Sequence, residues 1–341
     1  MKILIYGAGA IGSYLGGLLT EAGQDVTLMA RGAQLEALSA LGLVVVRNGQ
    51  ADQKTQVIAR ARGDCHGPYE LVIVTLKSMH LEAAAADISS LLTPDGVALM
   101  IQNGLPWWYL DGAESPLPGA HLSCLDSTGK LRSDLPLQKV IGAVIYKPVM
   151  QMEPGRIFLP DSASASLVIG EINNQKSPRL DNLAALMSEA GLPTTTTQNI
   201  RLAKWRKLMI NLVWNSLCAI TQSTSGRIAA SQKARALVKN IIAEGLAVAH
   251  SVGMYLSLDA DEALDRVAGN MDQQPSMLQD VRAGRPLECD AIVNAVVELA
   301  SFTGVAVPTL NSIAACLDVL NETLKRDRLP IGPAGKLIES Q

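Results

Sequence analysis

The stretch Gly7-Ala8-Gly9-Ala10-Ile11-Gly12 decides the fold class of this chain. The apolar run from Ile3 to Tyr6 precedes it and predicts a buried parallel strand, and the periodicity from Ile11 to Ala22 predicts a helix after it. A second strand is expected from Val26 to Ala30. A strand, a G-x-G-x-x-G turn, a helix and a second strand within about thirty residues are typical of a dinucleotide-binding unit.

Each glycine of this turn has an expected role. Gly7 would make the tight turn, Gly9 would let a pyrophosphate approach the backbone, and Gly12 would let helix and strand pack closely. The free amide groups at the start of the helix would face the phosphates. The sequence therefore predicts cofactor contacts along the whole turn, at Gly7, Ala8, Gly9, Ala10, Ile11 and Gly12. The alternative is a glycine-rich turn without a ligand.

Arg31 ends the second strand, where a site for NAD usually carries an acidic residue for the ribose hydroxyls. Asp25 lies at the wrong end of that strand. A guanidinium group suits a 2′-phosphate because its planar fork binds two phosphate oxygens. We therefore expect NADPH/NADP as cofactor; the alternative for Arg31 is a solvated surface side chain.

Composition excludes several classes of protein. The 341 residues suffice for two domains, and a net charge of -3 gives no reason to expect nucleic acid. The five cysteines lack metal-site spacing, so neither a disulfide framework nor a metal site is expected. Neither a signal peptide nor a membrane span is expected, since strand residues follow Lys2 and no apolar run is long enough. A cytoplasmic location is expected.

The pattern along the chain changes near residue 197. Before it, strands alternate with helices, with further strands expected at Leu71 to Leu76, Val97 to Gln102, Val140 to Met150 and Ser166 to Ile169. The strands between Val140 and Leu159 are expected to extend the sheet in antiparallel fashion. After it, helices are expected at Ile200 to Ile220, Ala229 to Val252, Asp259 to Met271, Glu288 to Thr303 and Leu310 to Arg326.

This pattern predicts an α/β fold: an N-terminal Rossmann-type dinucleotide-binding domain over residues 1–197, followed by an all-α C-terminal domain over 198–341. In open α/β sheets, ligands lie outside the carboxyl ends of the strands. Lys77 and Asn103 each follow a predicted strand, so they are candidates to line the cofactor and substrate. The alternative for both is an ordinary loop residue.

A polar stripe marks the first helix of the second domain. Lys207, Asn211 and Asn215 are four residues apart in a segment that is otherwise almost entirely apolar. Each four-residue step turns a helix by only about 40°, so the three share one face. Polar groups on a buried helix need partners or a wet cleft. The stripe therefore predicts either hydrogen bonds between helices or a substrate wall, expected in a cleft between the domains.

A lysine beside NADPH has a specific use. Hydride arriving at a carbonyl carbon leaves an alkoxide, which needs a proton and a stabilising charge, and Lys207 can supply both. Burial and the nearby Lys204 and Arg206 are expected to lower its pKa. Asn211 and Asn215 would orient substrate oxygens by hydrogen bonds.

The chain resembles the ketopantoate reductase family (2-dehydropantoate 2-reductases) over most of its length. The matching residues are the Gly7 to Gly12 turn, Arg31, Val74 to Lys77, Gln102 to Gly104, Trp205 to Leu208 with Asn211 and Asn215, and Ser276 to Asp280 with Glu288. The resemblance implies NADPH-dependent reduction of 2-dehydropantoate (ketopantoate) to pantoate, in pantothenate biosynthesis. It also implies the roles of the site residues: Lys207 as general acid, Asn211, Asn215 and Ser276 as substrate ligands, Glu288 near Lys207 or the cofactor ribose, and Lys77 and Asn103 on the nicotinamide side.

From residue chemistry alone, Glu288 is also explained as a helix-start carboxylate and Ser276 as an N-cap. The chain departs from the family pattern at Leu105 to Tyr109, which holds three aromatics, and at an apparent insertion over 113–139. The aromatics are either a packing anchor or a change in the pocket. Two alternative functions follow, namely reduction of a different 2-oxo acid or an imine, and a non-catalytic NADP sensor. A homodimer is expected through the apolar helical domain.

Overall fold

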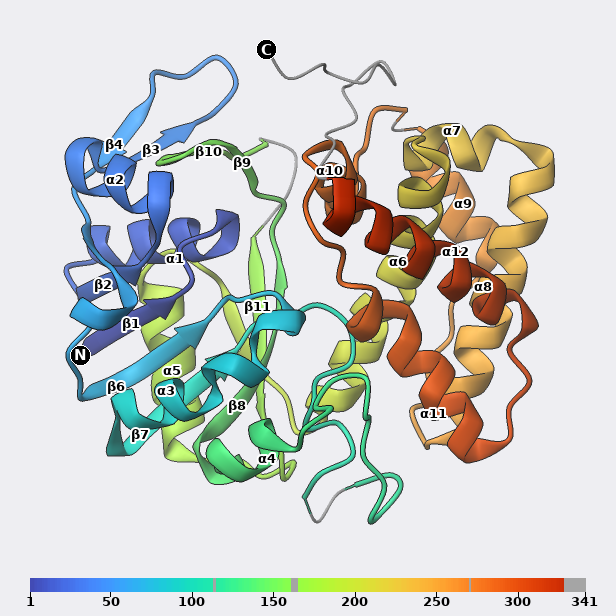
Figure 1. The fold of residues 1–341 in the computed structure, drawn as a ribbon, viewed down its shortest axis with the longest axis horizontal. Coiled ribbons are helices and arrows are strands. Elements are labelled where there is room, and N and C mark those ends of the chain that lie inside the picture. Colours follow the sequence, from blue (N-terminus) through green and yellow to red (C-terminus); the bar gives the residue numbers. More distant parts are fainter. Residues whose placement is uncertain (113–114, 161–164, 270, 328–341) are drawn as a thin grey trace. The chain divides into compact units, whose positions relative to one another are not determined.

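The computed structural model describes residues 1–112, 115–160, 165–269 and 271–327 (Figure 1). The chain divides into two compact units. The first comprises residues 1–102, 112–114 and 128–203, and the second comprises 103–111, 115–127 and 204–341. The prediction placed one domain boundary, after residue 197. In the structure, the segments 103–111 and 115–127 also belong to the helical unit. Residues 328–341 of the expected second domain lie outside the described part.

A parallel sheet forms the centre of the first unit. Its described strands lie in the order β12 (Thr194–Thr196), β11 (Ser166–Glu171), β8 (Val140–Tyr146), β7 (Leu92–Met100), β6 (Tyr69–Val74), β1 (Lys2–Tyr6), β2 (Asp25–Met29) and β5 (Ile58–Arg60). Neighbouring strands are parallel except β8 and β11, which are antiparallel. The α/β fold class is therefore confirmed, whereas the strand expected to extend the sheet in antiparallel fashion, β8, pairs in parallel with β7, and the sheet changes direction only at β11.

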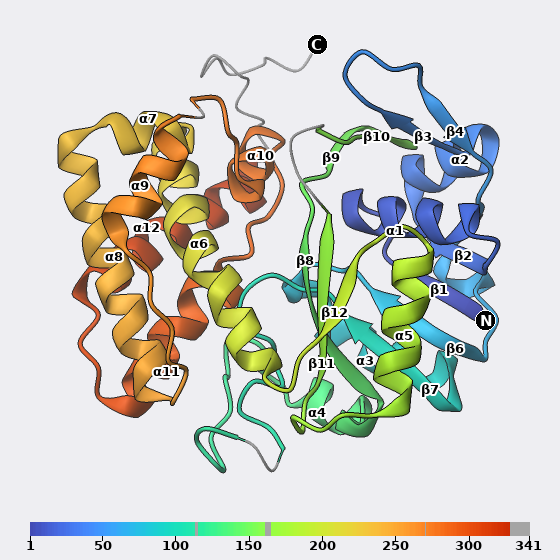
Figure 2. The same ribbon diagram turned by 180° about the vertical axis from the view of Figure 1, so that it is seen from behind.

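Alternating residues of the strands face opposite layers of helices. Ile3 and Ile5 of β1 share a buried cluster with apolar residues of two helices, α1 (Ala10–Glu21) and α5 (Pro178–Glu189). These helices cover the same face of the sheet, and α3 (Ala85–Leu91) packs against β6 and β7 on the other (Figure 2). Strands buried on both faces must be apolar throughout, which explains why the first strand shows no alternation.

The prediction was wrong for the hairpin around residue 155. The expectation was that all strands up to Leu159 extend the main sheet, but β9 (Met150–Glu153) and β10 (Arg156–Phe158) belong to a separate small sheet with β3 (Leu43–Val46) and β4 (Gln53–Thr55). β10 pairs in parallel with β3, far away in sequence. Strands of three or four residues carry too little pattern to reveal such a partner.

The remaining helices of the first unit are short. α2 (Gly32–Leu41) follows β2, with Arg31 at its N-cap, and α4 (Lys130–Asp134) lies within the apparent insertion.

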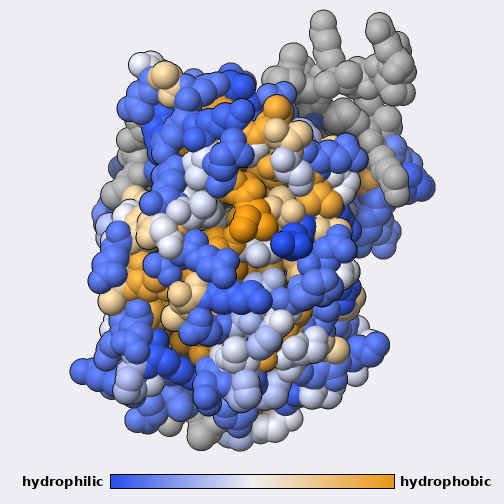
Figure 3. All heavy atoms as spheres, turned by 90° about the vertical axis from the view of Figure 1, so that its left-hand side faces the viewer, coloured by the Kyte–Doolittle hydropathy of each residue, from blue (hydrophilic) through white to orange (hydrophobic). Residues whose placement is uncertain are grey.

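On the face that Figure 3 shows, hydrophobic residues gather near the centre and hydrophilic residues surround them.

The second unit is helical, as predicted. Its described helices are α6 (Ile200–Thr221, which begins in the first unit), α7 (Ser225–Ala230), α8 (Gln232–Ser251), α9 (Ala260–Ala268), α10 (Ser276–Arg282), the π-helix η5 (Asp290–Asn294), α11 (Ala295–Thr303) and α12 (Pro308–Asp327). Two expected single helices are each divided, one at Ser231 and the other into η5 and α11.

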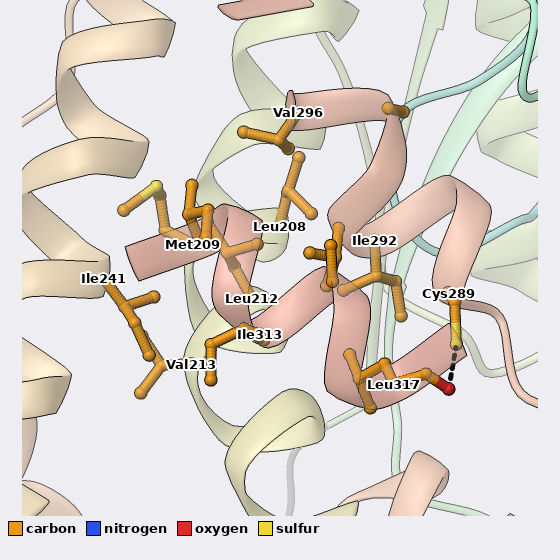
Figure 4. Packing of buried hydrophobic residues seen from close by; sticks show 14 of the residues in the cluster. Leu208, Met209, Leu212, Val213, Ile241, Cys289, Ile292, Val296, Ile313 and Leu317 are labelled. Carbon is orange, nitrogen blue, oxygen red and sulfur yellow. Dashed lines mark hydrogen bonds between the residues drawn. The ribbon is translucent and has the colours of Figure 1, made fainter. Parts of the chain in front are cut away.

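Apolar side chains of several helices form the core of this unit (Figure 4). Leu208 and Leu212 come from α6, Ile241 from α8 and Leu317 from α12. The Sγ atom of Cys289 lies 3.8 Å from the carbonyl oxygen of Leu317, which joins the segment before η5 to α12. The core therefore fixes α6 on its apolar side, which leaves its polar stripe on another side.

Candidate active site

The glycine-rich turn has the geometry that a dinucleotide requires. Gly7 has a φ of +111°, in the region that favours glycine. A Cβ atom at Gly12 would lie 2.1 Å from the carbonyl oxygen of Gly7, so α1 packs against the turn only without a side chain there. At Gly9, by contrast, a Cβ atom would meet no protein atom within 4 Å. The space above Gly9 is open to a phosphate group, next to the free amides of α1.

A cavity of about 570 Å³ lies at the carboxyl ends of three strands of the first unit. Tyr6 is the last residue of β1, Arg31 comes shortly after β2 and Lys77 shortly after β6. All three side chains line the cavity. The strand order changes direction between β1 and β6, which is where doubly wound sheets bind ligands. Gly7, Ala8 and Gly9 also line this cavity. Its position and lining fit a dinucleotide.

The cavity has a basic side. Arg31, Arg62, Lys77 and His80 line it. Burial lowers the pKa of His80, and the charges of Arg31 and Lys77 lower it further, which shows that the three lie within electrostatic reach of one another. Arg62 donates a hydrogen bond of 2.9 Å from Nε to Asp87. An anionic ligand suits such a lining better than a neutral one.

Sequence reasoning missed Arg62 and His80, and also Gln34 and Gln151. Gln34 donates from Nε2 to the carbonyl oxygen of Ala8 at 2.9 Å and accepts from Gln151 at 2.6 Å. It therefore fastens the glycine-rich turn to the small sheet. Arg62 follows β5, a strand that the sequence reading did not identify; recognising β5 would have placed Arg62 at the carboxyl edge of the sheet.

The second unit holds Lys207 close to Glu288. Burial lowers the pKa of Lys207 to about 8, and the carboxylate of Glu288 acts in the opposite direction by favouring the ammonium form. Burial was a predicted cause, whereas neither Lys204 nor the exposed Arg206, both also predicted, is among the charges that act on Lys207. Glu288 itself is 9% exposed and stands two residues before η5. A lysine of this kind is a cation at neutral pH and still gives up its proton readily.

Asn103 joins this group from a distant part of the chain. Its Nδ2 atom lies 3.5 Å from Oε2 of Glu288. Gly104 has a φ of +78°, and a Cβ atom there would lie 2.0 Å from the carbonyl oxygen of Ala291 in η5. Only glycine allows the backbone to approach η5 so closely, and this approach is what brings Asn103 to Glu288.

The amides of the stripe differ in their partners. Oδ1 of Asn215 accepts hydrogen bonds from the Ser276 hydroxyl at 3.4 Å and from the Met277 amide at 3.2 Å. Asn215 therefore binds the start of α10, whose N-cap is Pro275 rather than Ser276. Nδ2 of Asn211 is buried without a hydrogen-bond partner in the described part of the chain. A buried donor without a partner is costly, and a substrate oxygen would satisfy it.

The aromatic segment is a packing anchor. Trp107, Trp108 and Tyr109 are 3%, 0% and 0% exposed. The Tyr109 hydroxyl accepts a hydrogen bond of 2.7 Å from Nε1 of Trp205, and the two rings meet edge to face. Trp205 lies two residues before Lys207, so the segment supports the part of α6 that carries the stripe. The apparent insertion over 113–139 is held at Ser123, whose hydroxyl donates a hydrogen bond to Glu298 at 2.6 Å.

The comparisons with known proteins now decide the family. The family model described as "Ketopantoate reductase PanE/ApbA" matches residues 3–174, and the model of its C-terminal domain matches residues 199–321. The chain belongs to the ketopantoate reductase family. A 2-dehydropantoate 2-reductase of Mesorhizobium japonicum is 37% identical over 92% of this chain and 96% of its own length. The protein is thus an oxidoreductase that acts on a CH–OH group.

Solved structures show the same fold. A PanE/ApbA family ketopantoate reductase from Ralstonia eutropha has a TM-score of 0.79 at 30% identity, covering 95% of this chain and 100% of its own. A D-mandelate dehydrogenase, solved with NADH and anilino(oxo)acetate, has a TM-score of 0.80 at 25% identity with the same coverages, 95% and 100%. The similarity to both extends over nearly the whole chain.

The described residues offer neither a membrane-spanning helix nor a cluster of metal ligands. No helix in this part of the chain is long and apolar enough to cross a membrane. Nor do three or more His, Cys, Asp or Glu side chains gather there in a way that would hold a metal ion.

Proposed function

We propose that this protein reduces ketopantoate to pantoate with NADPH, and that Lys207 is the general acid. The observation that carries the proposal is the half-buried Lys207 within electrostatic reach of Glu288, on a helix face that also presents an amide donor of Asn211 without a partner among the described residues. Ketopantoate reductases dominate the similar proteins of known name, which supports this substrate. Its product, pantoate, places the enzyme in pantothenate biosynthesis.

NADPH supplies the hydride. The first unit would hold the cofactor, with its pyrophosphate over Gly9 and the amides of α1 and its 2′-phosphate at Arg31. Lys77 belongs to the same cavity. Asn103, beside Glu288 in the second unit, is proposed as a ligand on the nicotinamide side. The open space at Gly9 and the basic lining both fit this assignment.

The residues of the second unit would complete the reaction on the substrate. As hydride adds to the ketone carbon, the electron pair of the C=O double bond moves to the oxygen, and Lys207 gives that oxygen its proton. Its ammonium group also stabilises the developing negative charge. Glu288 favours the protonated form of Lys207 before the reaction. Asn211, Asn215 and Ser276 would orient the hydroxyl and carboxylate oxygens.

A second candidate substrate is an aromatic 2-oxo acid, favoured by the similarity to a D-mandelate dehydrogenase that binds anilino(oxo)acetate. That protein was solved with NADH, whereas Arg31 here favours NADPH. The homodimer expected from the apolar helical domain stays a prediction, which light scattering during gel filtration tests.

The test is a substrate panel with both cofactors. Ketopantoate, 2-oxoisovalerate and phenylglyoxylate are each offered with NADPH and NADH, and deuterium transfer from deuterated NADPH to C2 of the product is followed by NMR. The proposal predicts the highest kcat/KM for ketopantoate with NADPH. A higher value for phenylglyoxylate would establish the second candidate, and no turnover of any 2-oxo acid would contradict both.

A further inference from the structure

A second buried lysine lies on the face of α6 that bears Lys207. Lys204 precedes Lys207 by three residues, and Asn211 and Asn215 follow at four-residue steps. Helix positions three and four apart share a face, with Cβ atoms about 5–6 Å apart. Lys204 is 3% exposed. Lys204 therefore extends the polar stripe one turn earlier than predicted, and a second buried cation, Arg201, lies three residues before it.

Among Lys204 and the two charges that act on it, Lys207 and Glu288, the charges do not balance at low pH. The pKa of Lys204 is lowered to about 7, chiefly by burial and also by the ammonium group of Lys207, while the carboxylate of Glu288 acts to raise it. Lys207 acts from the same helix and Glu288 from the segment before η5. When both lysines are protonated, two ammonium groups accompany one carboxylate. When Lys204 loses its proton, Lys207 and Glu288 balance each other.

We propose that Lys204 makes the site selective for an anionic substrate, because its ammonium group supplies a second positive charge that attracts the carboxylate of a 2-oxo acid. In a buried environment such a charge acts over several ångströms, so direct contact with the substrate is not required. The attraction lasts only while Lys204 holds its proton, and Lys207 remains the proton donor. This inference rests on the proposed function.

The experiment compares a charged and a neutral ketone of similar shape. KM for ketopantoate and for ketopantoyl lactone, which lacks the carboxylate, is measured with saturating NADPH between pH 6 and pH 8. The enzymes are the wild type, Lys204→Met, which removes the charge, and Lys204→Arg, which keeps it at every pH. Arg206→Met is the matched control, since it removes an exposed cation from the same helix.

In the wild type, KM for ketopantoate is expected to rise about tenfold from pH 6 to pH 8 as Lys204 loses its proton. In Lys204→Met it is expected to be about tenfold above the wild type at pH 6 and to change little with pH. Lys204→Arg should keep a low KM throughout, and KM for the lactone should stay level in every enzyme. Arg206→Met should behave as the wild type.

Three results would overturn the inference: a pH-dependent KM retained in Lys204→Met, an equal rise in KM for the lactone, or the same change in Arg206→Met. The lactone comparison also separates charge from structure, because a damaged site would handle both ketones poorly. If Lys204→Met does not fold, Lys204→Arg decides. A rise in its KM for ketopantoate between pH 6 and pH 8 as large as that of the wild type would contradict the inference. A wild type that reduces neither ketone would instead reject the proposed function.

Discussion

The main-chain amide of Leu105 donates a hydrogen bond of 2.8 Å to the carbonyl oxygen of Ala291. Ala291 lies within η5, where the amide of Ala295 reaches back five residues to Asp290. A π-helix disturbs the usual pairing four residues apart, and such turns are frequent at functional sites. Here the irregular turn binds the loop that contains Asn103 and Leu105, and this contact places Asn103 beside Glu288.

Gly104→Ala should therefore lower kcat by about 10- to 100-fold, because its Cβ atom would force the loop off η5 and displace Asn103. Gly253→Ala is the matched control: Gly253 has a φ of +75°, close to that of Gly104, but a Cβ atom there meets nothing within 4 Å. Both variants should lose stability in thermal unfolding from backbone strain, and Gly104→Ala should lose more because its Cβ atom also collides with Ala291. Equal kcat values for the two variants would show that docking on η5 does not matter.

The two glycines of the cofactor turn should respond differently to alanine. Gly9→Ala should leave the unfolding temperature almost unchanged, since its Cβ atom would enter open space, but it should weaken NADPH binding by about tenfold or more. Gly12→Ala should reduce both, because its Cβ atom would collide with Gly7. Fluorescence titration and thermal unfolding measure the two effects. Normal NADPH affinity in Gly9→Ala would place the pyrophosphate elsewhere.

Arg31→Gln should remove the preference for NADPH. Loss of a charge-assisted contact worth about 1.5–3 kcal/mol would weaken NADPH binding by roughly 10- to 150-fold and leave NADH binding almost unchanged. Arg60→Gln is the control, an exposed arginine at the end of β5 that does not line the cavity. Dissociation constants for both cofactors decide the matter. Parallel losses for NADPH and NADH would argue against a 2′-phosphate contact.

The reduction rate should fall above about pH 8. Lys207 acts in its protonated form, and burial places its pKa at about 8, so kcat should drop about tenfold per pH unit beyond that value. Glu288 raises this pKa, so Glu288→Gln should move the fall to lower pH by about one unit. Profiles of kcat against pH for both enzymes test this. A fall that stays in place in Glu288→Gln would contradict the assigned coupling.

The sequence predicts the first unit well because its signals are local. The turn from Gly7 to Gly12 lies between a continuous apolar strand and a helix; Gly7 and Gly12 meet steric demands that the structure shows, and Gly9 borders open space. The face shared by Lys207, Asn211 and Asn215 also follows from helix periodicity alone. The same periodicity includes Lys204, but a lysine that precedes an apolar run is easily read as an ordinary helix-start residue.

Features that depend on distant contacts were not predictable in this way. The pairing of β3 with β10 joins strands more than a hundred residues apart. The proximity of Asn103 to Glu288 depends on η5, and the sequence gives no signal for a π-helix. The aromatics at 107–109 were open to two interpretations, and the hydrogen bond from Trp205 to Tyr109 shows for one of them, Tyr109, that it supports α6.

The most direct test of the central claim is NADPH oxidation with ketopantoate in the wild type, in Lys207→Ala and in Lys233→Ala, an exposed lysine of α8. Lys207→Ala should lose about 10²- to 10⁴-fold in kcat while its NADPH affinity stays normal, and Lys233→Ala should match the wild type. Wild-type turnover in Lys207→Ala would contradict Lys207 as the general acid. Tight NADPH binding without turnover in the wild type would instead support an NADP sensor.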